Sequence, residues 1–323
     1  MENNTLLQDL NNVERIANGS KVKRLLNNPF RYCFAILLKN AVYPFLQKEV
    51  AVFCRLFSGR KIKILLPAST DIYLTGGKSH PSEIKLSKFL ILNLKRGDIF
   101  WDIGAHYGYF SMIAADLVGK HGQVLSVEAS SVAFKMLAEN CSELRNNIVL
   151  HNAVLNEAGK VAFYELPNLY SEYNSTDITQ FEKETWFRKV KPHQVIVDAV
   201  SLDELYLNYP GIKNPAIIKI DVEGGELGVI EGGQRLFEQE SPVIVMEYLE
   251  PNRNNEPHRK ALNLLTRIGY LPYVMQKDGS LLQTNDIEHH LSVNNLGSDN
   301  IVFRKGTDGN LPWSISGKLT GNK

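Results

Sequence analysis

Short apolar segments alternate with amphipathic segments along most of this chain, and that alternation restricts the folds it can adopt. The apolar runs have the length of strands and lie at 99–103, 123–127, 148–151, 216–220, 242–246, 270–275 and 300–303. Segments with helical spacing lie between them at 109–118, 131–145, 226–237 and 257–268. Apolar strands that alternate with amphipathic helices predict an α/β fold, with a parallel sheet covered by helices on both faces.

The segments outside this alternation divide the chain into parts. Residues 1–60 predict a mainly helical amino-terminal extension, with no strong strand pattern before Lys61. Residues 61–305 predict the α/β domain, and residues 306–323 predict a carboxy-terminal tail. A polar stretch at 167–194, rich in Ser, Tyr, Asn, Thr and Glu, interrupts the rhythm and predicts an irregular insertion or lid.

The start of the α/β domain predicts two strands and a helix. Residues 61–66 and 70–75 have the composition of strands, and residues 67–69 would join them. Ser82 is a suitable N-cap for a helix whose apolar residues keep helical spacing up to Gly97.

The composition is balanced in charge and poor in cysteine. Lys and Arg number 36 against 35 acids, so the net charge is +1 and no overall attraction to nucleic acid is expected. Three widely spaced cysteines disfavour a disulfide framework or a cysteine zinc site, and they favour a reducing, cytoplasmic location. Residues 1–10 are polar, and the apolar run at 32–38 is far shorter than the ~20 residues of a membrane span. Neither a signal peptide nor a spanning helix is therefore expected.

The segment 15–63 is strongly basic. It holds eleven Lys or Arg residues and a single acid, Glu49, interleaved with aromatic and aliphatic residues. One interpretation is a basic amphipathic surface that makes a weak peripheral contact with anionic lipid, or binds a glycolipid substrate. The other is a helical extension that packs its apolar side on the main domain and leaves its charges in solvent. The second interpretation is favoured.

Glycine-rich and polar residues follow the predicted strands, and ligands of open parallel sheets bind at the carboxyl ends of the strands. Gly104 and Gly108 follow the strand at 99–103 and allow the backbone to approach a ligand closely. Asp102 lies two residues before the first of these glycines. The spacing lacks the third glycine of the dinucleotide fingerprint, which argues against a nicotinamide cofactor. A tight turn without a ligand is the alternative.

Two further strand ends suit an adenosine cofactor. Glu128 follows the strand at 123–127, where an acid can accept hydrogen bonds from both ribose hydroxyls. Asn152 and Ala153 follow the strand at 148–151, which would place them near an adenine ring. Alone, Asn152 would be interpreted as a turn residue.

Three acids crowd the turn after the strand at 216–220: Asp221, Glu223 and Glu226. Such acids can orient a substrate, accept a proton, hold a cofactor or ligate a metal. They would also stabilise the positive end of the following helix without any ligand. A divalent cation needs oxygen ligands from several segments, and the sequence identifies no others, so no metal is expected.

In combination, these motifs resemble the FkbM family of S-adenosylmethionine-dependent methyltransferases. The resemblance covers about residues 70–305 and rests on the segments 102–111, 127–128, 152–154, 201–205 and 218–226. It implies a Rossmann-like sheet of seven strands whose last strand is antiparallel. It also implies S-adenosylmethionine as cofactor and O-methylation of hydroxyls on polyketides, glycans and similar metabolites.

The resemblance implies site residues as well. The cofactor loop would be formed by Asp102, Gly104, Ala105 and Gly108, and Glu128 would bind the ribose. Asn152 and Ala153 would lie beside the adenine, and Asp221 and Glu223 would face the methyl donor and the acceptor. Two departures from the family pattern affect the adenine edge and the shape of the turn. Ala129 and Ser130 replace a frequent proline after the ribose acid, and Gly225 replaces a frequent alanine. Neither removes a charge.

Methyl transfer to an oxygen needs an aligned acceptor and a base that takes one proton. Asp221 or Glu223 is the expected base, and Glu226 and Glu247 are expected behind them. Several acids in one cleft raise one another's pKa values. The expected acceptor is a hydroxyl of a glycan or secondary metabolite, and an NAD-dependent oxidoreductase or a non-catalytic Rossmann-like binding protein remain the alternatives.

Overall fold

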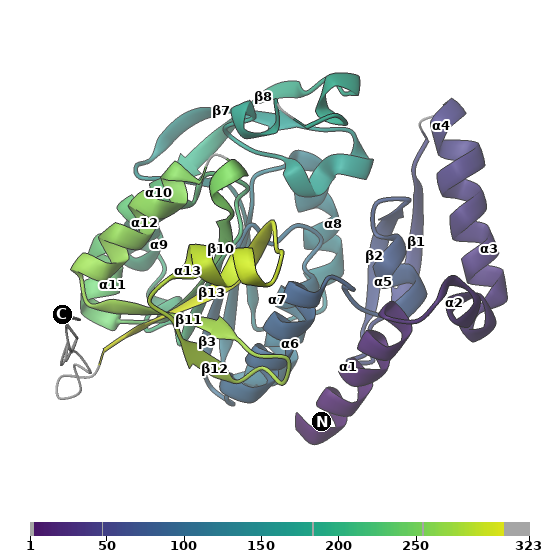
Figure 1. Cartoon of the computed structure of the whole chain (residues 1–323). Coiled ribbons are helices and arrows are strands. Elements are labelled where there is room, and N and C mark those ends of the chain that lie inside the picture. The colour runs from purple at the N-terminus through teal and green to yellow at the C-terminus, as the bar shows by residue number, and fades with distance from the viewer. Residues whose placement is uncertain (1–2, 47, 183, 254, 307–323) are drawn as a thin grey trace, which may run out of the picture.

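The computed structural model describes residues 3–46, 48–182, 184–253 and 255–306 (Figure 1). Apart from Gly306, the tail predicted at 306–323 lies outside the described residues.

An eight-stranded sheet organises the chain. In spatial order its strands are β12 (Leu281–Gln283), β11 (Tyr270–Met275), β13 (Ser298–Lys305), β10 (Val243–Leu249), β9 (Ile217–Ile220), β3 (Ile99–Ile103), β4 (Gln123–Glu128) and β5 (Asn147–His151). The strands from β10 to β5 are parallel, and β13 runs antiparallel to β10. This confirms the Rossmann-like fold with an antiparallel last strand. The sheet has one strand more than predicted, because the short β12 folds back and pairs with β11 at the edge.

Helices cover both faces of this sheet (Figure 1). On one face lie α6 (Pro81–Asn93), α7 (Tyr109–Val118) and α8 (Ser131–Cys141), and on the other α9 (Leu202–Asn208), α10 (Glu226–Glu231), α11 (Gln234–Glu240), α12 (Glu256–Arg267) and α13 (Ile287–Val293). Successive strand residues enter opposite cores, so Phe100 packs with α6 and α7 while Trp101 packs with α9. Burial on both faces explains why these strands read as continuous apolar runs.

One predicted helix is broken in two. The single helix expected at 226–237 is divided into α10 and α11 at Gly232 and Gly233. A Cβ on Gly232 would lie 2.3 Å from the carbonyl oxygen of Leu155, so glycine is needed for this close approach.

A second, three-stranded sheet was not predicted. It consists of β6 (Ala153–Val154), β8 (His193–Val200) and β7 (Gly159–Glu165). The segment between β7 and β8, residues 166–192, is called the insertion below. Its described helical parts are only 3-10 turns, at Asn168–Tyr173, Thr179–Phe181 and Phe187–Lys189, which confirms the irregular segment. The rings of Tyr173 and Trp186 stack 5.0 Å apart within it.

The amino-terminal region is mainly helical, as predicted. It contains α1 (Asn3–Ala17), α2 (Lys21–Asn27), α3 (Pro29–Leu37), a π-helical turn (Leu38–Val42) and α4 (Tyr43–Leu46). A partly buried ion pair, Lys88 to Glu14 at 2.6 Å, fixes α1 against α6.

Three local predictions in this part of the chain are wrong. Residues before Lys61 do form a strand, since β1 (Val50–Arg55) pairs antiparallel with β2 (Lys61–Leu66). Thr70–Thr75 is the helix α5 and not a strand, because Gly76 at φ 79° terminates it as a left-handed C-cap. Ser82 lies inside the first turn of α6, whose N-cap is His80, and the two side chains are 2.7 Å apart.

Candidate active site

The carboxyl ends of β3, β4, β5 and β9 border a cavity of about 360 Å³, where ligands of open α/β sheets bind. Six predicted site residues line it: Gly104, Glu128, Asn152, Ala153, Asp221 and Glu223. Asp102, Ala105 and Gly108 do not line it and are buried. The loop motifs therefore do converge, although not every residue in them faces the ligand space.

The loop after β3 depends on glycine. Gly104 has φ 78°, and a Cβ there would lie 1.7 Å from the carbonyl oxygen of Asp221. Gly108 has φ 85° and is the N-cap of α7; a Cβ there would lie 2.8 Å from Leu137 Cδ1. The two glycines thus allow the loop to lie against both the acidic turn and α8.

Glu128 ends β4 and is only 8 % exposed. Its two carboxylate oxygens accept hydrogen bonds from the backbone N–H groups of His106 and Ser130, each at 2.8 Å. Burial raises the pKa of Glu128 to about 7, although these two donors favour the ionised form. Each oxygen retains a further lone pair, so the carboxylate can also accept ribose hydroxyls.

Lys219 on β9 connects the parts of the candidate site, and the sequence analysis assigned it no role. Its Nζ lies 3.2 Å from Asp102 Oδ1 and 3.2 Å from Asp221 Oδ2, and it donates to the Gly104 carbonyl at 3.0 Å. Lys219 is 3 % exposed, which a lysine tolerates only when its charge is paired. The available signal was the lysine itself, within a strand of four residues that is otherwise apolar.

Asp102 is thereby a counter-ion in the core. It is fully buried, and its Oδ2 accepts a hydrogen bond from Ser111 Oγ at 2.6 Å. Asp102 fixes Lys219, and Lys219 in turn fixes the loop and Asp221.

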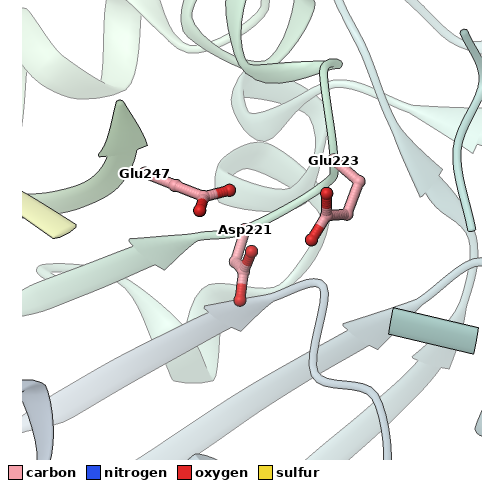
Figure 2. Close-up of side chains that lie close together, drawn as sticks. All are labelled: Asp221, Glu223 and Glu247. Carbon is pink, nitrogen blue, oxygen red and sulfur yellow. The ribbon is translucent and has the colours of Figure 1, made fainter. Parts of the chain in front are cut away.

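Three carboxylates converge at the ends of β9 and β10 (Figure 2). One oxygen each from Asp221, Glu223 and Glu247 lies within 4.8 Å of the others. Among the described residues this is the one group of three acidic, histidine or cysteine side chains close enough to share a metal ion. Glu247 completes the group from a second strand, β10. The sequence analysis expected Glu247 only behind the acidic turn, not as a member of the group.

The three acids of this cluster differ in protonation. Burial alone would raise the pKa of Asp221, but Lys219 and Lys78 hold it below its ordinary value. Burial, then repulsion from Glu247 and Asp221, raises the pKa of Glu223 well above its usual range. Burial, then repulsion from Asp221, raises the pKa of Glu247 to about 7. The cluster therefore holds one firmly ionised acid, Asp221, beside Glu247, which can exchange a proton near neutral pH, and Glu223, whose protonated form is favoured.

Glu226 lies behind this cluster. It is fully buried at the start of α10, where its Oε1 accepts a hydrogen bond from Val222 N–H at 3.3 Å. Its Oε2 is 3.3 Å from Nε2 of His258, and it does not line the cavity.

Most of the remaining cavity wall comes from segments that carried no recognisable motif, and His106 of the loop after β3 adds to it. Lys78 forms an ion pair with Glu83 and lies 3.4 Å from Glu172 of the insertion. Tyr173 and Arg253 also line the cavity. His106 faces the same space; burial lowers its pKa to about 4, so it is neutral.

The model of the methyltransferase FkbM domain matches residues 102–272, which is more than half of the 323 residues. The chain belongs to the FkbM methyltransferase family. This membership confirms the predicted family, the methyltransferase class and S-adenosylmethionine as the cofactor. The FkbM domain spans all four of the strand ends described above.

Solved structures similar to this chain include two methyltransferases and a fibrillarin. Methyltransferase FkbM from Methylobacillus flagellatus KT is 15% identical with a TM-score of 0.40, over 73% of this chain and 52% of that one. A precorrin-6y C5,15-methyltransferase from Geobacter metallireducens GS-15 is 14% identical with a TM-score of 0.37, over 70% and 88%. Aeropyrum pernix fibrillarin in complex with natively bound S-adenosyl-L-methionine is 13% identical with a TM-score of 0.39, over 69% and 74%.

The ribose assignment of Glu128 can be tested by binding alone. We expect Glu128→Ala to weaken binding of S-adenosylhomocysteine by about 1–3 kcal/mol, the cost of losing charge-assisted hydrogen bonds. Isothermal calorimetry measures this, with Glu157→Ala, an exposed acid of the loop after β6, as the control. Unchanged affinity in Glu128→Ala would reject the assignment.

Proposed function

We propose that this FkbM methyltransferase transfers a methyl group from S-adenosylmethionine to a hydroxyl oxygen of a glycan or small metabolite. The observation that carries the proposal is the acid cluster beside the cofactor loop, with Glu247 at a pKa of about 7. An aliphatic hydroxyl is a poor nucleophile until a base takes its proton, and a base is most effective when its pKa lies near the working pH.

The residues at the strand ends fit this cofactor. The glycine-dependent loop allows close backbone approach, Glu128 has lone pairs for ribose, and Asn152 and Ala153 border the space where an adenine would lie. When bound, S-adenosylmethionine supplies a methyl group on a positively charged sulfur, which needs no further activation.

The acids of the cluster would have two separate roles, attraction of the cationic donor and acceptance of the hydroxyl proton. Asp221, held ionised by Lys219, provides negative charge that favours a cationic donor. Glu247 or Glu223 accepts the hydroxyl proton as the oxygen–carbon bond forms, while the carbon–sulfur bond breaks and its electron pair stays on sulfur. Only one of these two carboxyl groups, Glu247 or Glu223, has to be ionised to accept the proton.

The cavity wall supports a neutral, hydroxyl-rich acceptor over nucleic acid. Asp221 and Glu172 both line it and both have pKa values below the ordinary range, so a phosphate backbone would meet ionised carboxylates there. His80, Tyr173 and Asn300 offer hydrogen-bonding groups of the kind that sugars engage.

We also propose a cytoplasmic location with a weak peripheral contact to anionic membrane. Cys33, Cys54 and Cys141 are free thiols, which agrees with a reducing compartment. Among the described helices, none has both the length and the apolar character required to cross a bilayer. The contact would be made by the basic segment 15–63.

Labelled S-adenosylmethionine and a panel of hydroxylated glycans and metabolites test the proposed function. We expect saturable cofactor binding and label recovered as an acid- and base-stable methyl ether. Label on nitrogen, or on RNA included in the panel, would reject the acceptor class. Cofactor binding without transfer to any acceptor would favour a non-catalytic binding protein.

The pH profile provides a separate test of the base. Because the base must be ionised, kcat/KM should rise about tenfold per pH unit below pH 7 and level off above it. Initial rates between pH 5 and pH 9 measure this, in roughly half-unit steps. Glu247→Gln should remove the inflection near pH 7, and an unaltered inflection in that variant would exclude Glu247 as its source.

A further inference from the structure

Large apolar side chains are exposed along the amino-terminal helices. Residues 20–46, which contain α2, α3, the π-helical turn and α4, are called the arm below. Phe30 is 88 % exposed, Phe45 83 % and Leu26 75 %, and Val22, Leu37 and Leu46 are each more than half exposed. The interpretation favoured from the sequence, that these side chains pack on the main domain, is therefore wrong for this set.

The opposite side of the arm is what holds it to the protein. Ala35, Leu38 and Tyr43 are buried. Arg31 donates a hydrogen bond to the Tyr73 carbonyl at 3.3 Å, and its guanidinium lies 5.1 Å from the centre of the Tyr73 ring. The arm is thus attached through one side to α5, and it lies at the outer edge of the molecule, away from the eight-stranded sheet (Figure 1).

The charged side chains around the exposed apolar residues are predominantly basic. Between residues 15 and 49 the sequence contains seven Lys or Arg residues and one acid, the exposed Glu49. Lys21, Lys23, Lys39 and Lys48 are exposed. A patch of apolar and basic groups complements an anionic lipid surface, where the headgroups are negative and the interior accepts apolar side chains.

We infer that the arm is an interfacial membrane anchor, which inserts Phe30, Phe45 and Leu26 below the headgroups of an anionic leaflet. This inference deepens the proposed peripheral contact and rests on it, and it is independent of the proposed chemistry. A purely electrostatic contact is lost at high salt, whereas insertion leaves a salt-resistant part.

A second copy of the chain fits this surface less well. A two-fold interface brings the same patch of each subunit together, so the lysines of one arm would face those of the other. Like charges brought together at an interface oppose association. A membrane presents no such repulsion.

Vesicle co-sedimentation with the full chain tests the inference. We expect binding to phosphatidylcholine–phosphatidylglycerol vesicles at about 0.1 M NaCl, with part of it remaining at about 1 M, where the Debye length falls from about 10 Å to about 3 Å. Phe30→Ser with Phe45→Ser should lose the salt-resistant part, by on the order of tenfold for each phenylalanine. Lys21→Gln with Lys23→Gln should instead weaken the low-salt part.

A matched control and a spectroscopic probe complete the design. Leu282→Ser with Val293→Ser removes two exposed apolar side chains from β12 and α13, and it should bind vesicles as the wild type does. Phe30→Trp should show a blue shift of its emission with anionic vesicles and quenching by brominated lipid. Unchanged affinity for S-adenosylhomocysteine in each variant verifies the fold.

Three outcomes would overturn the inference, and they differ from failure of the methyl-transfer proposal. Complete release at high salt without a tryptophan shift leaves a peripheral contact without insertion. Absence of binding at both salt concentrations rejects the contact as well. A dimer that Phe30→Ser with Phe45→Ser converts to a monomer would make the arm an interface between copies.

Discussion

Gly104→Ala is expected to abolish methyl transfer by removing the cofactor site. The new Cβ would lie 1.7 Å from the Asp221 carbonyl oxygen, so either the loop after β3 or the acidic turn after β9 must move. The residue would also be held at φ 78°, a left-handed conformation that costs an alanine about 1–2 kcal/mol. Together with an overpacking cost of about 1–3 kcal/mol, the loss of cofactor affinity should be on the order of a hundredfold or more.

Calorimetry with S-adenosylhomocysteine measures this loss, and Gly97→Ala is the matched control. Gly97 has a similar φ of 93°, but a Cβ there would meet no atom within 4 Å. It should therefore lose a little thermal stability and keep full cofactor affinity. Wild-type affinity in Gly104→Ala would show that the loop can move aside without affecting the site.

Substitutions in the acid cluster are expected to have the second large effect. Asp221→Asn, Glu223→Gln and Glu247→Gln each replace a carboxyl group, which can accept a proton when ionised, by an amide of nearly the same size. Loss of the general base should lower turnover by roughly 10²–10⁴-fold. Glu223→Gln and Glu247→Gln should leave cofactor affinity close to that of the wild type, since Asp102 and Asp221 remain to pair with Lys219. Asp221→Asn should also weaken binding, because it removes the ionised partner of Lys219.

Single-turnover rates with an acceptor from the panel measure these effects. Glu231→Gln, an exposed acid at the end of α10, is the control and should turn over normally. If all three cluster variants methylate at the wild-type rate, the base is not a member of this cluster.

Much of the fold was predictable because buried strands must consist mostly of apolar residues, and such runs can be recognised in the sequence. The strands β3 and β9 are covered by helices on both faces, so nearly every residue in them must be apolar. The two exceptions are Asp102 and Lys219, and the role of Lys219 was not predicted. From the sequence alone, a single lysine in an apolar run can also mean that the strand boundaries are misplaced. Only the structure shows that Lys219 is buried beside a charged partner, Asp102.

Other features depend on contacts between distant segments, which local patterns do not record. The six residues of α5 have the composition of a strand, but they form a helix that ends at Gly76, whose left-handed conformation caps it. Glu247 has an ordinary place on a strand and joins Asp221 only because β10 pairs with β9. The exposure of Phe30 was not predictable from spacing, because an amphipathic pattern does not tell what covers its apolar side.

The cavity has two walls of different construction, and this has a consequence for how its specificity changes during evolution. On one wall, Lys219 connects the loop carbonyl of Gly104 with Asp102 and Asp221, so a substitution in any of these groups disturbs the others. The other wall includes Glu172 and Tyr173 of the insertion, which runs from β7 to β8. It meets the first wall through hydrogen bonds between His106 and Ser171 at 3.2 Å and from Ser175 Oγ to the Glu223 carbonyl at 2.6 Å. Descendants of this protein can therefore vary the insertion away from Ser171 and Ser175 while inheriting the methyl-donor wall almost unchanged, so that new acceptors arise without a new catalytic centre.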